Sequence, residues 1–87
     1  MEYIVVIGKA KNNYSAYSPD VLGCIAAAKT VEETLALMKE ALEFHLEDLE
    51  EIPEAKGLEY HLANGLEAEL GESDLITKIK VELSETV

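Results

Sequence analysis

The apolar pattern near the N-terminus predicts β-strands. Residues 3–7, Tyr-Ile-Val-Val-Ile, form a continuous apolar run rich in β-branched side chains, and the run stops at Gly8. Asn12-Asn13 supplies a turn, and residues 14–18 follow as a second strand that Pro19 must end, because proline has no N–H to donate. Residues 22–28, centred on Gly23-Cys24-Ile25, predict a third strand. The short connections favour an antiparallel meander.

The period of the pattern changes at Thr30. Thr30 and Glu33 form a predicted capping box, in which the Thr30 hydroxyl accepts the Glu33 N–H and the Glu33 carboxylate accepts the Thr30 N–H. After it, a set of side chains falls within roughly 100° of one another around a helix. They are Val31, Leu35, Met38, Leu42, His45, Leu46 and Leu49. The pattern predicts a helix of about five turns, from Val31 to near Glu50, that buries this stripe and ends at Ile52-Pro53.

The last third of the chain predicts a short helix and a final strand. Residues 57–63 have helical character and end at Asn64-Gly65, a suitable left-handed cap, and residues 66–73 predict a turn or loop with some helical content. Residues 75–83 alternate between apolar and polar positions, as a half-buried strand does. We therefore expect one α+β domain over residues 1–87, in the order β-β-β-α-β, whose core is residues 3–54 plus the strand at 75–83.

The composition adds a strong negative charge. The chain carries 18 acidic and 7 basic residues, for a net charge of −11. Such a surface repels phosphate backbones, so we expect no direct nucleic-acid binding and a basic protein partner, unless the acidity serves only solubility. The single cysteine, the absence of an apolar run long enough to span a membrane, and an N-terminus unlike a signal peptide indicate a cytoplasmic protein without membrane contact.

The acidic side chains gather on the helix face opposite the apolar stripe. Several lie near the C-terminal end of the helix, where each opposes the helix dipole at a cost of about 0.3–1 kcal/mol. Leu37 and Phe44 share an angular position about 130° away from the stripe, so we expect an exposed apolar pair bordered by carboxylates. This arrangement is typical of a docking site, although residues 57–70 or a second subunit would equally cover the pair. The predicted partner-binding residues are Leu37, Glu40, Glu43, Phe44, Glu47, Asp48 and Glu51.

Catalytic chemistry has little support in the sequence. His45 and His61 are far apart, no metal-ligand spacing recurs, and there is no glycine-rich phosphate loop, so we expect neither a metal nor a cofactor. Cys24 would be a nucleophile only if His45 approached it, and a cysteine in an apolar strand is more often a core residue. Asp20 is expected to order its own turn through its own backbone. The chain therefore predicts a binding protein rather than an enzyme.

The order of several short motifs resembles the HicB-like antitoxin domain. Residues 14–24 read Tyr-Ser-Ala-Tyr-Ser-Pro-Asp-Val-Leu-Gly-Cys, residues 30–35 read Thr-Val-Glu-Glu-Thr-Leu, and residues 39–46 read Lys-Glu-Ala-Leu-Glu-Phe-His-Leu, followed by Ile-Pro-Glu at 52–54. That family typically has Y-x-A-x-x-P-D-L-P-G-C, then T-x-E-E-A and E-A-I-x-x-H-L. The chain departs from it at Val21-Leu22, at residues 26–29 and at Thr34. The matching positions are Tyr14, Pro19, Asp20, Gly23, Cys24, Thr30, Glu33 and His45.

The resemblance implies a fold and a function. The fold is part of an RNase H-like domain, usually dimeric or higher, and the function is to neutralise a small basic HicA-type mRNA-cleaving toxin by covering its RNA-binding surface. An acidic protein suits that role by charge complementarity. Many relatives continue into a DNA-binding domain, and with the chain ending at Val87 we do not expect operator binding.

Two alternatives stay open. One is a stand-alone homo-oligomeric module without a toxin partner. The other is a degenerate RNase H-like nuclease, which would need several carboxylates around a divalent ion, whereas Asp20 is the only acidic residue in 3–28.

Overall fold

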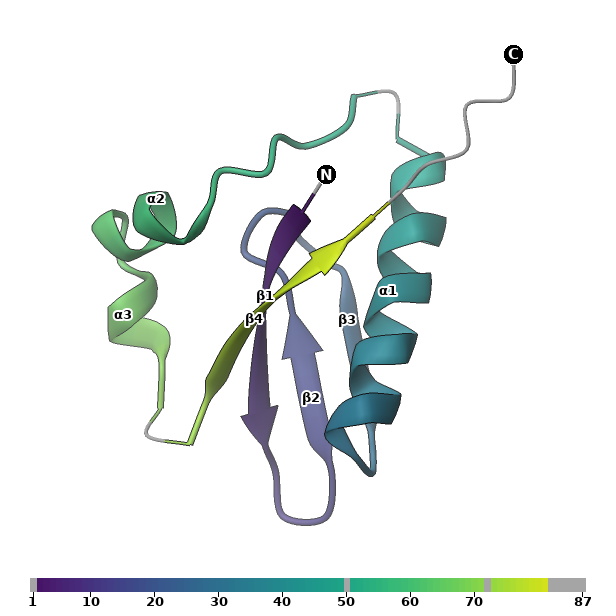
Figure 1. Ribbon diagram of the computed structural model, residues 1–87, viewed down its shortest axis with the longest axis vertical. Coiled ribbons are helices and arrows are strands. Elements are labelled where there is room, and N and C mark those ends of the chain that lie inside the picture. The colour runs from purple at the N-terminus through teal and green to yellow at the C-terminus, as the bar shows by residue number, and fades with distance from the viewer. Residues whose placement is uncertain (1, 50, 72, 82–87) are drawn as a thin grey trace.

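The strands form one antiparallel sheet with a long helix on one face. The computed structural model describes residues 2–49, 51–71 and 73–81. The strands β1 (Glu2–Lys9), β2 (Tyr14–Tyr17), β3 (Ile25–Ala28) and β4 (Leu75–Lys80) lie in the order β3-β2-β1-β4 (Figure 1). The helices are α1 (Val31–Glu47), α2 (Leu58–Ala63) and α3 (Leu66–Glu69). The α+β class, the meander and the element order predicted from the sequence are confirmed.

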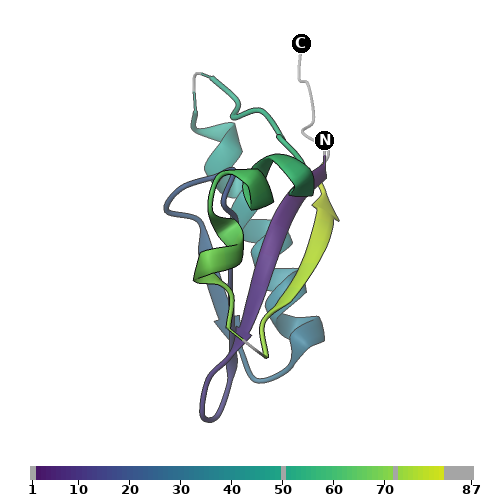
Figure 2. The same cartoon turned by 90° about the vertical axis from the view of Figure 1, so that its left-hand side faces the viewer.

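Strand β1 is buried on both faces. Its five central residues, Tyr3 to Ile7, are each 2% exposed or less. Tyr3, Val5 and Ile7 belong to the cluster packed under α1, so Ile4 and Val6 point to the opposite face of the sheet. Helices α2 and α3 lie on that opposite face (Figures 1 and 2). Burial on two faces explains why this strand is a continuous apolar run, whereas a half-buried strand would alternate.

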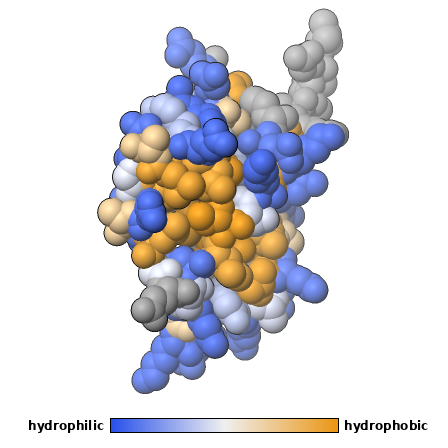
Figure 3. All heavy atoms as spheres, turned by 60° about the vertical axis from the view of Figure 1, so that its left-hand side comes forward, coloured by the Kyte–Doolittle hydropathy of each residue, from blue (hydrophilic) through white to orange (hydrophobic). Residues whose placement is uncertain are grey.

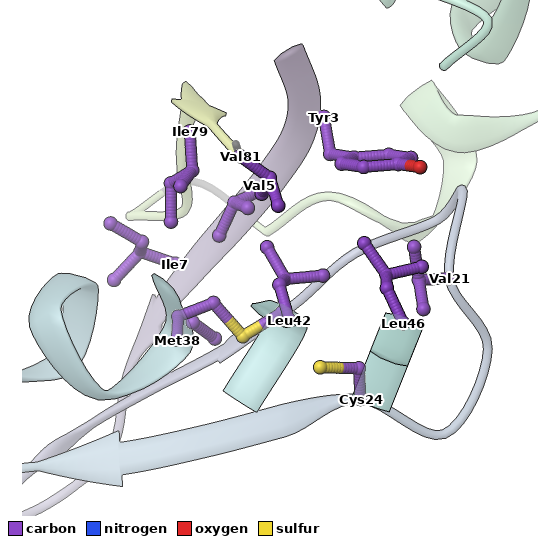
Figure 4. Close-up of a cluster of buried hydrophobic side chains, with 11 residues drawn as sticks. Tyr3, Val5, Ile7, Val21, Cys24, Met38, Leu42, Leu46, Ile79 and Val81 are labelled. Carbon is purple, nitrogen blue, oxygen red and sulfur yellow. The ribbon is translucent and has the colours of Figure 1, made fainter. Parts of the chain in front are cut away.

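Helix α1 supplies the other half of the core. Met38, Leu42 and Leu46 are fully buried and point toward β1 (Figure 4). The remaining apolar members of the predicted stripe, Val31, Leu35 and Leu49, pack against this cluster, while His45 is half-buried at its border. Of the helices in the described ranges, none combines the length and apolar character needed to cross a membrane.

Thr34 is a buried position that the sequence pattern did not predict. Its side chain is 0% exposed, and its hydroxyl donates to the Thr30 carbonyl oxygen at 2.7 Å. That bond satisfies the hydroxyl inside the protein, so a polar side chain is tolerated beside the stripe.

Half of the predicted capping box is present at the start of α1. The Thr30 hydroxyl accepts the Glu33 N–H at 3.1 Å. The Glu33 carboxylate, at an exposed position, does not make the reciprocal bond to the Thr30 N–H, so that part of the prediction is wrong.

The helix ends slightly earlier than predicted. It stops at Glu47, where Asp48 is the C-cap and the Leu49 N–H bonds the Leu46 carbonyl at 3.2 Å in a tighter turn. Glu50, the predicted end, lies outside the described residues.

The predicted third strand is correct only in its second half. Strand β3 begins at Ile25, whereas the sequence pattern placed its start at Leu22. Gly23 has a φ of +83°, a left-handed conformation that does not occur within a strand. The Cys24 N–H then bonds the Val21 carbonyl at 3.4 Å, which makes residues 21–24 a turn. Strand β4 is described to Lys80, and positions 82 and 83 of the predicted strand lie outside the described residues.

The segment between α1 and β4 contains the predicted short helix, α2. Gly65 follows it with a φ of +102°, in the left-handed region that the Asn64-Gly65 signal predicted. The helical content expected in residues 66–73 is α3.

Tyr3 ties the segment after α1 back to the sheet. Its hydroxyl donates to the Pro53 carbonyl oxygen at 2.7 Å across 50 residues of sequence. Burial, together with the nearby negative charge of Asp20, raises the pKa of Tyr3 above its ordinary value of 10.0. The neutral phenol is therefore the form that stabilises the fold.

We predict that Tyr3→Phe lowers the free energy of unfolding at neutral pH by about 0.5–1.5 kcal/mol, because the Pro53 carbonyl loses its donor.

The raised pKa of Tyr3 predicts a pH dependence of stability as well. Stability from Tyr3 is fully present below pH 10.0 and is lost as the pH rises through its higher folded-state pKa. Urea unfolding between about pH 8 and pH 11.5 should show a shallower alkaline decline in the variant than in the native chain. Equal slopes would contradict this assignment, and Tyr60→Phe, at an exposed position, should leave neutral-pH stability unchanged.

Candidate functional site

A shallow groove runs along the outer side of α1. It is lined by Leu37, Glu40, Ala41, Glu43, Phe44 and Glu47. Leu37 is 43% exposed and Phe44 is 72% exposed, whereas Met38 and Leu42, on the inner side of the same helix, are fully buried. Other large apolar side chains of this chain are exposed as well, but Leu37 and Phe44 line one groove together with carboxylates, and an apolar patch with a polar rim is typical of a binding surface.

The groove has an apolar seam and an acidic rim. Leu37, Ala41 and Phe44 follow one another at spacings of four and three residues, which places them on one side of the helix. The three other lining residues, Glu40, Glu43 and Glu47, are all carboxylates, so the rim carries only negative charge. Five of the seven predicted partner-binding residues therefore lie together.

Ala41 is a lining residue that the sequence analysis missed. Its position four residues after Leu37 and three before Phe44 carried the necessary signal. Because alanine has only a methyl group, it leaves room between its two larger neighbours for a side chain from another molecule.

The remaining two predicted partner-binding residues lie beyond the groove. Asp48 is exposed at the C-cap of α1, and Glu51 is exposed in the segment that follows, so neither lines the groove. The alternative that residues 57–70 cover Leu37 and Phe44 is wrong, because α2 and α3 lie across the sheet from α1 (Figures 1 and 2). The apolar pair is left open in the single chain.

Asp20 serves as a long-range structural link. Its side chain is 1% exposed, and its Oδ1 lies 2.7 Å from Nε2 of His61 and accepts the Lys56 N–H at 3.1 Å. The prediction that Asp20 orders its own turn is therefore wrong for the carboxylate, although its backbone N–H donates to the Ser18 hydroxyl at 3.3 Å. A buried carboxylate requires strong donors, and His61 on α2 and the Lys56 N–H just before α2 both bond Oδ1, whereas the buried Oδ2 has no hydrogen-bond partner among the described residues.

The position of Asp20 does not favour the nuclease alternative. The carboxylate points inward to His61, and among the described residues no group of three or more His, Cys, Asp or Glu side chains could hold a metal ion. His61, which is 9% exposed, was not predicted as a partner of Asp20, since 41 residues separate the two in sequence.

Cys24 belongs to the core. It is 4% exposed and lies beside Leu42 and Leu46 (Figure 4), and burial raises the pKa of its thiol. A thiol with a raised pKa is protonated at neutral pH and is a poor nucleophile. Cys24 and His45, both described, share no hydrogen bond.

Three other motif positions lie at the two ends of β2. Tyr14 is half-buried against the core, and Pro19 is half-buried in the loop between β2 and β3. Gly23 holds the positive φ within the turn of residues 21–24, and no atom lies within 4 Å of where a Cβ would be, so backbone conformation rather than space favours glycine there.

Comparison with known proteins assigns the family. Residues 3–85 match the family model described as the HicB-like antitoxin of bacterial toxin-antitoxin systems. The chain belongs to the HicB-like antitoxin family.

Two relatives of this HicB-like chain match by sequence. An uncharacterized 14.9 kDa protein from the rep-hol intergenic region of Haemophilus phage HP1 is 38% identical over 66 residues, which cover 71% of this chain and 50% of that protein. A UPF0150 protein of Helicobacter pylori is 47% identical over 45 residues, covering 52% of this chain and 62% of that protein. The matched region thus spans half to about three-fifths of each relative's length.

Solved structures share the HicB-like fold. The N-terminal domain of Burkholderia pseudomallei antitoxin HicB superposes with a TM-score of 0.77 at 20% identity, covering 95% of this chain and 100% of that one. A chain of the HicA3 and HicB3 toxin-antitoxin complex gives 0.74 at 23% identity, covering 94% and 99%.

We predict that Asp20 and His61 are energetically coupled. Asp20→Ala should lower the free energy of unfolding by about 1–3 kcal/mol, because the buried His61 on α2 and the Lys56 N–H lose their shared acceptor. In the Asp20→Ala variant, His61→Ala should lower the free energy of unfolding by less than it does in the native chain. The difference is a coupling energy of about 0.5–3 kcal/mol in a double-mutant cycle. The chain has no tryptophan, so circular dichroism during urea unfolding is a suitable measurement. Strictly additive losses would show that the 2.7 Å contact contributes nothing, and Glu54→Ala, at an exposed carboxylate, should be neutral.

Proposed function

We propose that this HicB-like chain is an antitoxin that neutralises a small basic HicA-type mRNA-cleaving toxin by covering its RNA-binding surface. The observation that carries the proposal is the groove on α1, where the exposed pair Leu37 and Phe44 is bordered by carboxylates on a chain of net charge −11.

The acidic rim would supply orientation and speed of association. A protein that cleaves mRNA must present positive charge to the phosphate backbone, and Glu40, Glu43 and Glu47 offer that surface a negative counterpart. Complementary charges steer two proteins together and fix their relative orientation more than they raise affinity. Asp48 and Glu51 would extend the same acidic surface beyond the end of the helix.

The apolar seam would supply affinity. Removing a side chain such as that of Phe44 from water contributes about 1.5–3 kcal/mol, and Phe44 is mostly exposed before binding. Helix α1 is already held by three fully buried side chains, Met38, Leu42 and Leu46, so docking need not order any backbone.

The comparisons support the class of partner. The structural neighbour named as the HicA3 and HicB3 toxin-antitoxin complex pairs a HicB protein with a toxin, and this chain has that fold. We propose that residues 1–87 act as one binding unit without catalysis, metal or cofactor, and that the unit works in the cytoplasm, where mRNA is found.

A stand-alone homo-oligomer is the second candidate. The exposed Leu22 and Ile25, which lie outside the groove, favour it. The neighbouring open reading frame separates the two candidates: a short basic frame with a central histidine supports the antitoxin, and its absence supports the homo-oligomer.

We predict that Phe44→Glu weakens binding to a HicA-type protein by at least about 30-fold, or roughly 2 kcal/mol, since an apolar anchor is lost and a charge is buried in its place. Isothermal titration calorimetry measures the change. Leu75→Glu is the matched control, because Leu75 is 54% exposed and lies outside the groove. Equal affinity of Phe44→Glu and the native chain would exclude the groove as the toxin-binding surface.

We also predict that the position of the carboxylates in the groove affects the association rate more than the net charge of the chain does. The triple variant Glu40→Lys, Glu43→Lys and Glu47→Lys should bind the same protein at least about tenfold more slowly. The control triple Glu54→Lys, Glu59→Lys and Glu67→Lys makes the same change in charge at exposed positions away from the groove. Stopped-flow association at low and high salt should show a strong salt dependence for the native and control chains and a weak one for the groove triple. If both triples behave alike, the acidity acts only through net charge.

A further inference from the structure

The residues that line the α1 groove follow the geometry of helix packing. When two helices pack side by side, a side chain of one enters a hole between four residues of the other, at positions i, i+3, i+4 and i+7. The lining residues form two such holes: Leu37, Glu40, Ala41 and Phe44, and then Glu40, Glu43, Phe44 and Glu47. Together the two holes account for every lining residue of the groove.

The two holes differ in chemistry. Ala41 carries only a methyl group, so the first hole has room for an apolar side chain between Leu37 and Phe44. The second hole has carboxylates at three of its four corners, which suits the side chain of Lys or Arg. It begins three residues after the first, about 4.5 Å further along the helix axis. The groove therefore fits an apolar and a basic side chain about one helical turn apart.

The rest of the surface defines an occupant less well. A broad apolar area is visible from the side of α2 and α3 (Figure 3). Exposed apolar residues on β3 and α2, such as Ile25 and Leu62, come from separate elements, so their spacing specifies no shape of partner. The groove on α1 combines a regular spacing with charge.

We propose that the groove receives one α-helix of the partner, which runs antiparallel to α1. This helix places an apolar side chain in the hole at Ala41 and a Lys or Arg side chain in the hole between the carboxylates. The inference rests on the proposed function for the identity of the partner, a HicA-type protein, and adds which kind of segment docks and in which direction.

Backbone hydrogen bonding favours a helix over an extended segment. The groove runs along a helix whose backbone groups bond one another, so it offers side chains to a partner and no sheet edge. An extended segment laid in it would bury N–H and C=O groups without partners, whereas a helix pairs its own. Extended peptides bind at sheet edges instead.

Charge at the end of α1 favours the antiparallel direction. Glu47 is the last residue of α1 and Asp48 is its C-cap, so both carboxylates lie where the helix dipole is negative. An antiparallel partner brings its positive N-terminus to this end, and a parallel partner would bring its negative C-terminus. The basic residue of the docking helix therefore precedes the apolar residue by about one turn.

The variant Ala41→Leu separates the two kinds of occupant. The larger side chain fills the first hole, so affinity for a HicA-type protein should fall by at least about tenfold. A segment that lies across the groove without entering the hole would gain apolar contact and bind as tightly or more tightly. Alanine and leucine both favour helices, and circular dichroism checks the fold. Ala36→Leu, at an exposed position of α1 outside the groove, is the matched control.

Synthetic peptides test the direction. Two Ala-rich helical peptides of about 18 residues have the same composition, with a Leu stripe and a Lys one turn before the central Leu in one peptide and one turn after it in the other. In NMR titrations of the native chain, the first should bind about two- to fivefold more tightly. A spin label on its N-terminus should broaden the amide signals of Glu47 and Asp48 more than that of Leu37. Proline in the middle of the first peptide should weaken binding by at least about tenfold, because it breaks the helix.

Several results overturn the proposal. They are unchanged or tighter binding by Ala41→Leu, equal binding of the proline peptide, no binding of either helical peptide, and broadening strongest at Leu37. An oligomer of the chain alone that Ala41→Leu dissociates would identify a second copy as the occupant and also overturn it.

The outcomes separate this inference from the proposed function. If Phe44→Glu weakens toxin binding and Ala41→Leu does not, the groove is the toxin-binding surface but receives no helix, so the inference fails and the function stands. If the peptides bind as expected and Phe44→Glu leaves toxin affinity unchanged, the helix-binding groove is supported and the proposed function fails.

Discussion

The packing of α1 on β1 is the contact on which the rest of this small domain depends. Met38, Leu42 and Leu46 are fully buried against Tyr3, Val5 and Ile7, and these six side chains form much of the cluster between sheet and helix. A domain of 87 residues has few such contacts to spare, because small domains bury a smaller share of their surface than large ones do. Strand β1 therefore contacts both helical layers, α1 on one face of the sheet and α2 and α3 on the other. The Tyr3 hydroxyl also donates to the Pro53 carbonyl oxygen, which holds the segment between α1 and α2 against the sheet.

The same helix that completes the core also forms the groove. Its inner side is fixed by packing, so its outer side can carry residues that do nothing for the stability of the single chain. Leu37 and Phe44 remain exposed, and Glu47 and Asp48 lie at the end of the helix where the dipole favours basic residues. A helix selected for stability alone would have neither feature. Both features fit the proposal that a partner contacts this surface, and the burial on the inner side of the helix offsets their cost in stability.

Local patterns in the sequence predicted most of the fold, whereas contacts between residues distant in sequence could not be predicted from them. The 3.6-residue period of α1, the continuous run of β1 and the Asn64-Gly65 stop signal each depend on neighbouring residues, and the structure agrees with them. The exposed pair Leu37 and Phe44 followed from the same period. The start of β3 was missed because the apolar residues from Leu22 to Ala28 hid the turn that Gly23 makes with a φ of +83°. The link between Asp20 and His61 was missed because only the folded chain brings together residues 41 apart.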